Sequence, residues 1–115
     1  MDNKPRKFPD PLVLVGGGEV DWQAVADLRA RGFPLVAADG GANDMPPSEA
    51  PPDMIIGDLD SLVDRERWDG RTEILHLAEQ ETTDFEKCLY ATDAPLYVAF
   101  GFLGRRLDHS LASLH

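Results

Sequence analysis

Short runs of apolar residues recur along the chain, and segments with helical spacing of apolar residues separate several of them. The runs predict five strands, at residues 12–15, 34–38, 54–56, 73–78 and 96–100. A run without polar interruption is typical of a parallel strand that is covered on both faces. Asp21 is a candidate N-cap for a helix that ends near Gly32. Thr83 and Glu86 fit a capping box at the start of another helix.

This alternation of strands and helices predicts an α/β fold. We expect a Rossmann-like, open and mainly parallel sheet with helices on both faces. Residues 44–53 hold four of the nine prolines and are expected to form a loop. Residues 61–68 could form two helical turns, and Asp108 could cap a last helix that carries Leu111 and Leu114.

The chain is organised as one domain behind a short leader. Residues 1–10 are polar, contain two prolines and are predicted to be flexible, and residues 11–115 are predicted to form the domain. A folded chain of this length buries about two-thirds of the surface of its extended form. This is enough for a hydrophobic core without disulfides or structural metal ions. Cys88 is the only cysteine, so no internal disulfide can form, which agrees with a reducing compartment.

The charge balance limits the classes of partner. The 21 acidic and 11 basic residues give a net charge of −10, and affinity for nucleic acid needs clustered basic residues, so a nucleic-acid partner is disfavoured. No apolar run approaches the ~20 residues that cross a bilayer, and the first run is too short for a signal peptide. We therefore expect a cytoplasmic protein without a membrane partner. If it handles phosphates, it needs a divalent cation.

Acidic residues follow the predicted strands at the edge where ligands of open parallel sheets bind. The topology gathers five of them there, at Asp39, Asp58, Asp60, Asp84 and Asp108. Two like charges about 4 Å apart repel by about 4 kcal/mol at an effective dielectric constant of 20, so the cluster favours a cation among its members. Mg²⁺ combines carboxylate oxygens with substrate phosphates and water.

Four of these five acids also have a structural interpretation. Asp58 and Asp60 project to the same side of extended backbone and could share one ion, but such a pair after a strand is equally typical of a turn. Asp84 could compensate the dipole of its helix, and Asp108 could be a helix cap. Convergence of all five on one edge is what favours a cation site.

Glycines and arginines near the same edge suggest phosphate binding. Gly40 and Gly41 would let backbone N–H groups approach a phosphate, although without other support an ordinary tight turn is the preferred interpretation of such a pair. Residues 16–18 do not complete a dinucleotide fingerprint, because Asp21 stands at the place of its third glycine. Arg105 and Arg106 are candidates for a phosphate clamp, with surface solubility as the alternative.

Other catalytic constellations are not supported. His76 lies in a predicted buried strand and is interpreted as structural, whereas His109 could face a ligand or solvent. Cys88 falls on the apolar face of its helix and is interpreted as a core residue. The sequence offers neither a Ser/His/Asp triad nor zinc ligands at suitable spacing.

Four segments together resemble the catalytic domain of thiamine pyrophosphokinases, which transfer a diphosphoryl group from ATP to thiamine. They are residues 38–43 (ADGGAN), 55–61 (IIGDLDS), 80–87 (QETTDFEK) and 106–109 (RLDH). They occur in the order of the family, and the resemblance extends over about residues 12–115.

The resemblance implies roles for individual residues. It implies that Asp58, Asp60 and Asp84 coordinate Mg²⁺. It implies that the nucleotide and diphosphate are bound by Asp39, Gly40, Gly41, Asn43, Gln80, Thr83, Arg106 and Asp108. Asp84 and Asp108 become candidates to accept the proton of the thiamine hydroxyl, and Arg106 becomes a candidate to stabilise the transferring group.

The chain also departs from the family pattern. Arg105 replaces a glycine and Glu81 replaces an aspartate, and the second, all-β domain of the family is absent, so the domain is expected to be incomplete at its C-terminus. Full-length members are homodimers, so the resemblance implies a homodimer for the full-length protein. Two alternatives to a thiamine diphosphokinase therefore stay open, namely a nucleotide-binding half-domain without turnover and another metal-dependent enzyme, such as a nucleotide-sugar transferase. The 115-residue chain alone could also be inactive.

Overall fold

The computed structural model describes residues 4–57, 65–68, 70–77, 81–102 and 111–112. Its strands are β1 (Arg6–Lys7), β2 (Leu12–Val15), β3 (Leu35–Ala38), β4 (Met54–Gly57), β5 (Glu73–His76), β6 (Thr92–Asp93), β7 (Tyr97–Phe100) and β8 (Leu111–Ala112). Its helices are α1 (Trp22–Ala30) and α2 (Asp84–Ala91), with 3₁₀ turns η1 (Asp39–Ala42) and η2 (Arg65–Arg67). Five of these strands lie where the apolar runs predict them.

The main sheet has the strand order β5-β4-β3-β2-β7-β8. Five strands, from β5 to β7, are parallel, and β8 pairs antiparallel with β7 at one edge. The chain moves outward from β2 through β3 and β4 to β5, and then returns through α2 to place β7 on the other side of β2. The order therefore reverses between β2 and β7, which is the position where open α/β sheets bind ligands. The predicted α/β sheet is confirmed.

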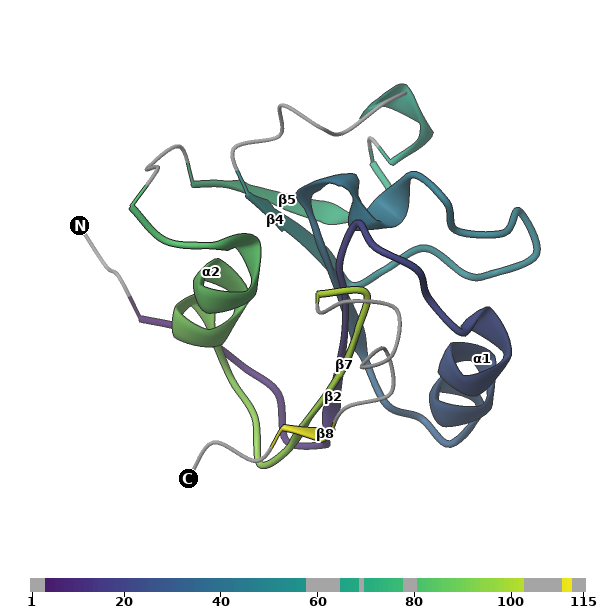
Figure 1. Ribbon diagram of the computed structural model, residues 1–115, viewed down its shortest axis with the longest axis horizontal. Coiled ribbons are helices and arrows are strands. Elements are labelled where there is room, and N and C mark those ends of the chain that lie inside the picture. The colour runs from purple at the N-terminus through teal and green to yellow at the C-terminus, as the bar shows by residue number, and fades with distance from the viewer. Residues whose placement is uncertain (1–3, 58–64, 69, 78–80, 103–110, 113–115) are drawn as a thin grey trace.

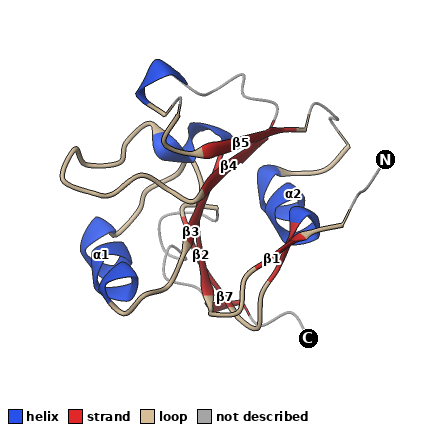
Figure 2. Cartoon of the chain, turned by 180° about the vertical axis from the view of Figure 1, so that it is seen from behind, coloured by secondary structure: helices blue, strands red, loops and turns tan. Residues whose placement is uncertain are grey.

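The two helices cover opposite faces of this sheet (Figures 1 and 2). Alternate residues of β2 enter different cores, because successive side chains of a strand point to opposite faces. Leu12 and Leu14 pack in the core that contains Cys88 of α2, whereas Val13 and Val15 pack in the core that contains Val25 of α1. This double burial explains the absence of polar residues in the run.

Both helices begin at the predicted caps. The Asp21 side chain accepts a hydrogen bond from the Ala24 N–H at 3.1 Å, and Gly32 follows the end of α1 with a φ of 94°. At α2, Thr83 Oγ1 accepts from the Glu86 N–H at 3.1 Å, and Glu86 Oε1 accepts from the Thr83 N–H at 2.9 Å. These reciprocal bonds form the predicted capping box.

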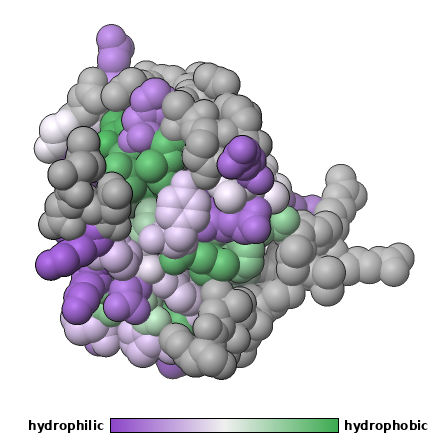
Figure 3. All heavy atoms as spheres, turned by 90° about the vertical axis from the view of Figure 1, so that its left-hand side faces the viewer, coloured by the Kyte–Doolittle hydropathy of each residue, from purple (hydrophilic) through white to green (hydrophobic). Residues whose placement is uncertain are grey.

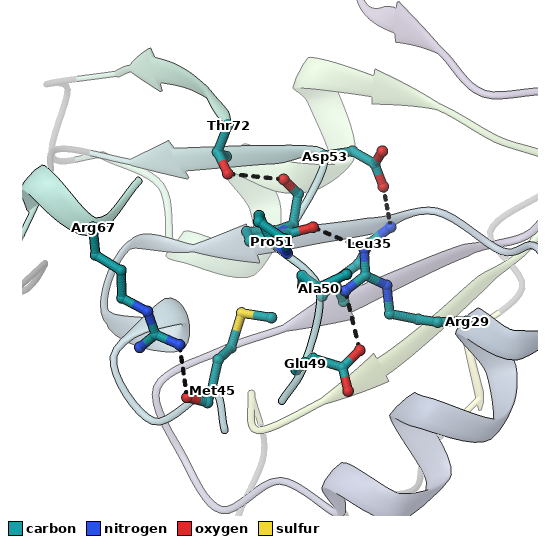
Figure 4. A network of polar contacts seen from close by, with 10 residues as sticks. Arg29, Leu35, Met45, Glu49, Ala50, Pro51, Asp53, Arg67 and Thr72 are labelled. Atoms are coloured by element: carbon teal, nitrogen blue, oxygen red, sulfur yellow. Dashed lines mark hydrogen bonds and ion pairs between the residues drawn. The ribbon is translucent and has the colours of Figure 1, made fainter. Parts of the chain in front are cut away.

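The proline-rich loop before β4 is held by polar contacts (Figure 4). Arg29 Nη1 forms an ion pair with Glu49 Oε1 at 3.1 Å, and Arg29 Nη2 donates to the Pro51 carbonyl at 2.8 Å. Asp53 Oδ2 accepts from the Leu35 N–H at 2.8 Å, which joins the end of the loop to β3. The contacts fix the loop between β3 and β4, so both strands enter the sheet in a defined register.

The first residues differ from the predicted flexible leader. Arg6 and Lys7 form β1, which pairs in parallel with Thr92 and Asp93 of β6. Phe8 is 9% exposed and belongs to the core on the α2 side of the sheet. Because this pairing joins segments far apart in sequence, a composition rule for residues 1–10 does not detect it.

The predicted final helix is wrong at its described positions, because Leu111 and Ala112 form β8. Asp108, its proposed cap, lies outside the described residues. The described part of the 61–68 segment contains only the 3₁₀ turn η2, and His76 is exposed rather than buried. No helix in the described part of the chain has the length and apolarity needed to cross a membrane.

Candidate functional site

A cavity of about 350 Å³ lies where the strand order reverses. It is lined by Gly17, Thr83, Asp84, Phe85, Gly101 and Phe102. Gly17 follows the carboxyl end of β2, Gly101 follows that of β7, and Thr83 and Asp84 begin α2. The cavity therefore combines two strand ends with a helix N-terminus, where the helix dipole favours an anion.

The backbones of the two strand ends approach each other closely at this cavity. The Gly18 N–H donates to the Gly101 carbonyl at 2.8 Å, and a Cβ at position 16 would lie only 2.7 Å from the Gly101 oxygen. Gly101 itself has a φ of 81°, in the region that favours glycine. Side chains at Gly16, Gly18 or Gly101 would push β2 and β7 apart. Because these residues are glycines, backbone atoms rather than side chains line this part of the cavity.

The turn after β3 places an aspartate under conformational strain. Asp39 is 3% exposed and has a φ of 43°, a conformation that non-glycine residues rarely adopt. A Cβ at Gly57 would lie 3.0 Å from the Asp39 Cβ, so the bare backbone at the end of β4 leaves room for this side chain. Strained residues of this kind cluster at functional sites. Asp39 is accordingly a candidate functional residue at the carboxyl edge.

The structure describes part of the predicted site. Thr83 and Asp84 line the cavity, and Asp39, Gly40, Gly41 and Asn43 lie in the turn that follows β3. The other predicted residues, Asp58, Asp60, Gln80, Arg106 and Asp108, lie outside the described residues. Among the described residues, no group of three or more His, Cys, Asp or Glu is placed to hold a metal ion.

A family model described as "Thiamin pyrophosphokinase, catalytic domain" matches residues 31–115. The chain belongs to this family. A comparison with curated proteins gives no match. The family match contains the turn at Asp39 and all of α2, whereas β2 and Gly17 precede it.

Phe85 and Phe102, which line the cavity of this thiamin pyrophosphokinase domain, and the buried Lys87 of α2 were not among the predicted site residues. Phe85 and Phe102 form a tilted aromatic pair with ring centroids 5.1 Å apart at the cavity wall. Lys87 is 3% exposed although it is charged. The sequence contains a signal for the burial of Lys87, because this residue is adjacent to Cys88, which also lies on the buried face of α2.

Thr83 has a structural role that the family resemblance does not include. Its hydroxyl is engaged in the capping box of α2. We expect Thr83→Ala to lower the free energy of unfolding by about 1 kcal/mol, because the Glu86 N–H loses its acceptor. Thr83→Ser keeps the acceptor and should restore most of the stability in urea unfolding. Equal stability of the alanine and serine variants would contradict this role.

Cys88 is confirmed as a core residue of the α2 side. Burial, with a further contribution from the negative charge of Asp84, raises the pKa of its thiol far above the ordinary value. Because the thiolate is the reactive form, we expect Cys88 to react with Ellman's reagent about 100-fold more slowly in the folded chain than in urea at pH 8. Similar rates in both states would contradict this placement of the helix.

A larger cavity of about 610 Å³ lies along the other side of α2. Its lining includes Leu89, Tyr90 and Tyr97, and Figure 3 shows apolar side chains between hydrophilic ones on the side of the molecule that carries this helix. Glu86 and Asp93 contribute two carboxylates, and no basic residue is among the described residues that line this cavity. The larger cavity reaches Tyr97 at the amino end of β7, whereas open parallel sheets bind ligands at the carboxyl ends of their strands, so the smaller cavity is the better candidate for a nucleotide site.

Proposed function

We propose that this chain transfers a diphosphoryl group from ATP to thiamine in the presence of Mg²⁺, giving thiamine diphosphate and AMP. The observation that carries the proposal is the position of Thr83 and Asp84. They lie within the segment that matches the thiamin pyrophosphokinase model, and they line the cavity where the strand order reverses. Both the family and the topology support the same edge of the sheet as the site.

The proposed reaction is an in-line displacement at the β-phosphorus of ATP. The hydroxyl oxygen of thiamine forms a bond to this phosphorus, and the bond from the phosphorus to the oxygen bridging the α-phosphate breaks. AMP leaves with that oxygen, and the hydroxyl proton passes to a carboxylate. Asp84 is the described candidate for this carboxylate, and Asp108 is a second candidate outside the described residues.

The described residues would contribute mainly positioning and charge stabilisation, which account for most catalysis of phosphoryl transfer. The N-terminus of α2 and the backbone walls at Gly17 and Gly101 would hold phosphate oxygens. Asp84, which is exposed at the cavity, offers the hard oxygen donor that Mg²⁺ prefers. We propose Asp58 and Asp60 as further ligands. When bound, the metal neutralises the charge of the diphosphate.

The proposal is tested by AMP formation. The chain is incubated with ATP, MgCl₂ and thiamine, and AMP and thiamine diphosphate are separated by chromatography. We expect equal amounts of both products, and no AMP when thiamine is omitted or the metal is chelated. ATP binding without any AMP would contradict the proposal and favour a nucleotide-binding domain without turnover. AMP release that does not depend on thiamine would favour a different acceptor. A homodimer of the full-length protein and a cytoplasmic location remain predictions.

A further inference from the structure

The larger cavity along α2 has no part in the proposed reaction. Its volume is about 610 Å³, within the range of about 300–1,000 Å³ that is typical of pockets for small molecules. It extends from Thr82, ahead of α2, to Asp93 in β6, and it reaches Tyr97 at the amino end of β7. Because the reaction is proposed at the carboxyl edge of the sheet, a molecule in this cavity would occupy a second site.

Aliphatic and aromatic side chains form part of the wall of this cavity. Glu86, Leu89 and Tyr90 lie on one face of α2, because residues three and four positions apart on a helix are neighbours. Among the described residues, Tyr90 is the large hydrophobic side chain that stays exposed, at 47%. The wall therefore offers apolar contact and an aromatic ring to an organic ligand.

The charges at this cavity are negative. Glu86 and Asp93 are exposed, and no basic residue is among the described residues of the lining. Lys7 is in register with Asp93, but it lines a neighbouring cavity of about 380 Å³ instead. A carboxylate attracts a cation, and so does the negative face of an aromatic ring. Both features favour a positively charged ligand.

Two buried hydroxyl groups of the lining point to the same preference. Thr92 Oγ1 donates to the Cys88 carbonyl at 2.6 Å, and Tyr97 Oη donates to the Thr92 carbonyl at 3.1 Å. Each hydroxyl has a single hydrogen, so the two oxygens, which lie 3.1 Å apart, keep only lone pairs. These hydroxyl groups can accept a hydrogen bond from a ligand but cannot donate one, which disfavours an anion.

We propose that this cavity binds a small organic cation of the alkylammonium class, with Tyr90 and Asp93 at its charged head and Leu89 beside its apolar part. Aromatic faces recognise quaternary ammonium groups in this way. A metal ion suits the site less well, because no group of three or more His, Cys, Asp or Glu in the described part of the chain is placed to hold one. The inference does not depend on the proposed function.

Choline and its neutral isostere 3,3-dimethylbutan-1-ol test the inference, because they have nearly the same shape and differ by one positive charge. The ¹⁵N-labelled chain is titrated with each at constant ionic strength, and backbone amide shifts are followed by NMR. We expect choline to cause saturable shifts at Leu89, Tyr90 and Asp93, with a dissociation constant at least 10-fold lower than that of the alcohol. Equal affinities, or no saturable shift with choline, would overturn the inference.

Variants at exposed positions locate the charged head. Asp93→Asn and Tyr90→Leu should each weaken choline binding at least 5-fold, because they remove the carboxylate and the aromatic ring. Asp27→Asn is the matched control, because it removes the same charge from an exposed residue of α1, on the opposite face of the sheet. Its affinity should stay within a factor of two of the wild type. Equal losses in Asp93→Asn and Asp27→Asn would mean that only net charge matters, and the proposed site would be wrong.

A second copy of the chain is the alternative occupant of this surface, and sedimentation velocity at increasing protein concentration detects it. A dimer that Tyr90→Leu dissociates, without saturable choline shifts at Leu89 and Asp93, would place protein in the cavity and overturn the inference. Choline shifts at these residues in a chain of unchanged sedimentation coefficient support it.

Discussion

Gly41→Ala should lower the free energy of unfolding by about 3 kcal/mol, because an added methyl group here overpacks a rigid backbone contact. A Cβ at this position would lie 2.4 Å from the Val15 carbonyl oxygen and 2.9 Å from that of Gly16. Both atoms belong to the backbone at the end of β2, so rotation of a side chain cannot relieve the contact. The turn η1 would have to move away from β2, and urea unfolding measures the loss.

Gly17→Ala is the matched control for this prediction. Gly17 belongs to the glycine triplet after β2, yet nothing lies within 4 Å of a Cβ built there. We expect its stability to stay within about 0.5 kcal/mol of the wild type. If Gly41→Ala and Gly17→Ala were equally stable, the close packing of η1 against β2 would be wrong.

Asp84→Asn should lower the rate of AMP formation by about 100-fold or more, because it removes the carboxylate that is proposed to accept the hydroxyl proton and to bind Mg²⁺, and general base catalysis is typically worth about 100-fold or more. Asparagine has almost the same shape, so the change removes the negative charge with little effect on packing. Asp84 is exposed at the first position of α2, and its replacement should alter stability by less than about 1 kcal/mol. Turnover at saturating ATP and thiamine is the measurement.

Glu86→Gln provides the control for Asp84→Asn, since it removes the same charge two residues further along α2. Glutamine can still accept the hydrogen bond from the Thr83 N–H that completes the capping box. Its rate of AMP formation should stay within a factor of about three of the wild type. Equal losses in both variants would mean that the net charge of the helix matters rather than the carboxylate of Asp84.

The elements that the sequence predicted correctly are those with local signals. The run at residues 12–15 is apolar on both sides because β2 is buried between two cores, and the pattern is visible without knowledge of its neighbours. The capping residues Asp21 and Thr83 bond to atoms three residues away, so their motifs also identify the starts of both helices.

The elements that the sequence did not predict depend on distant partners. Arg6 and Lys7 form β1 only because they pair with β6, more than eighty residues later in the chain. Leu111 and Ala112 become a strand because β7 offers them a free edge, whereas two apolar positions cannot distinguish a strand from a helix. Sequence order fixes neither pairing.

The candidate site was predicted in a similarly partial way. Topological rules place Asp39 and Asp84 at one edge of the sheet, and the structure describes both residues there. The aromatic pair and the burial of Lys87 depend on how α2 packs, and helical spacing alone assigns Phe85 to an apolar face without showing that it borders a cavity.

The most direct test of the account asks where the nucleotide binds. The ¹⁵N-labelled chain is titrated with ATP and MgCl₂, and backbone amide shifts are followed by NMR. The account predicts the largest shifts at Gly17, Thr83 and Gly101, which line the cavity between β2 and β7. Shifts concentrated at Leu89 and Asp93, in the larger cavity along α2, would contradict it, as would no shift at any amide.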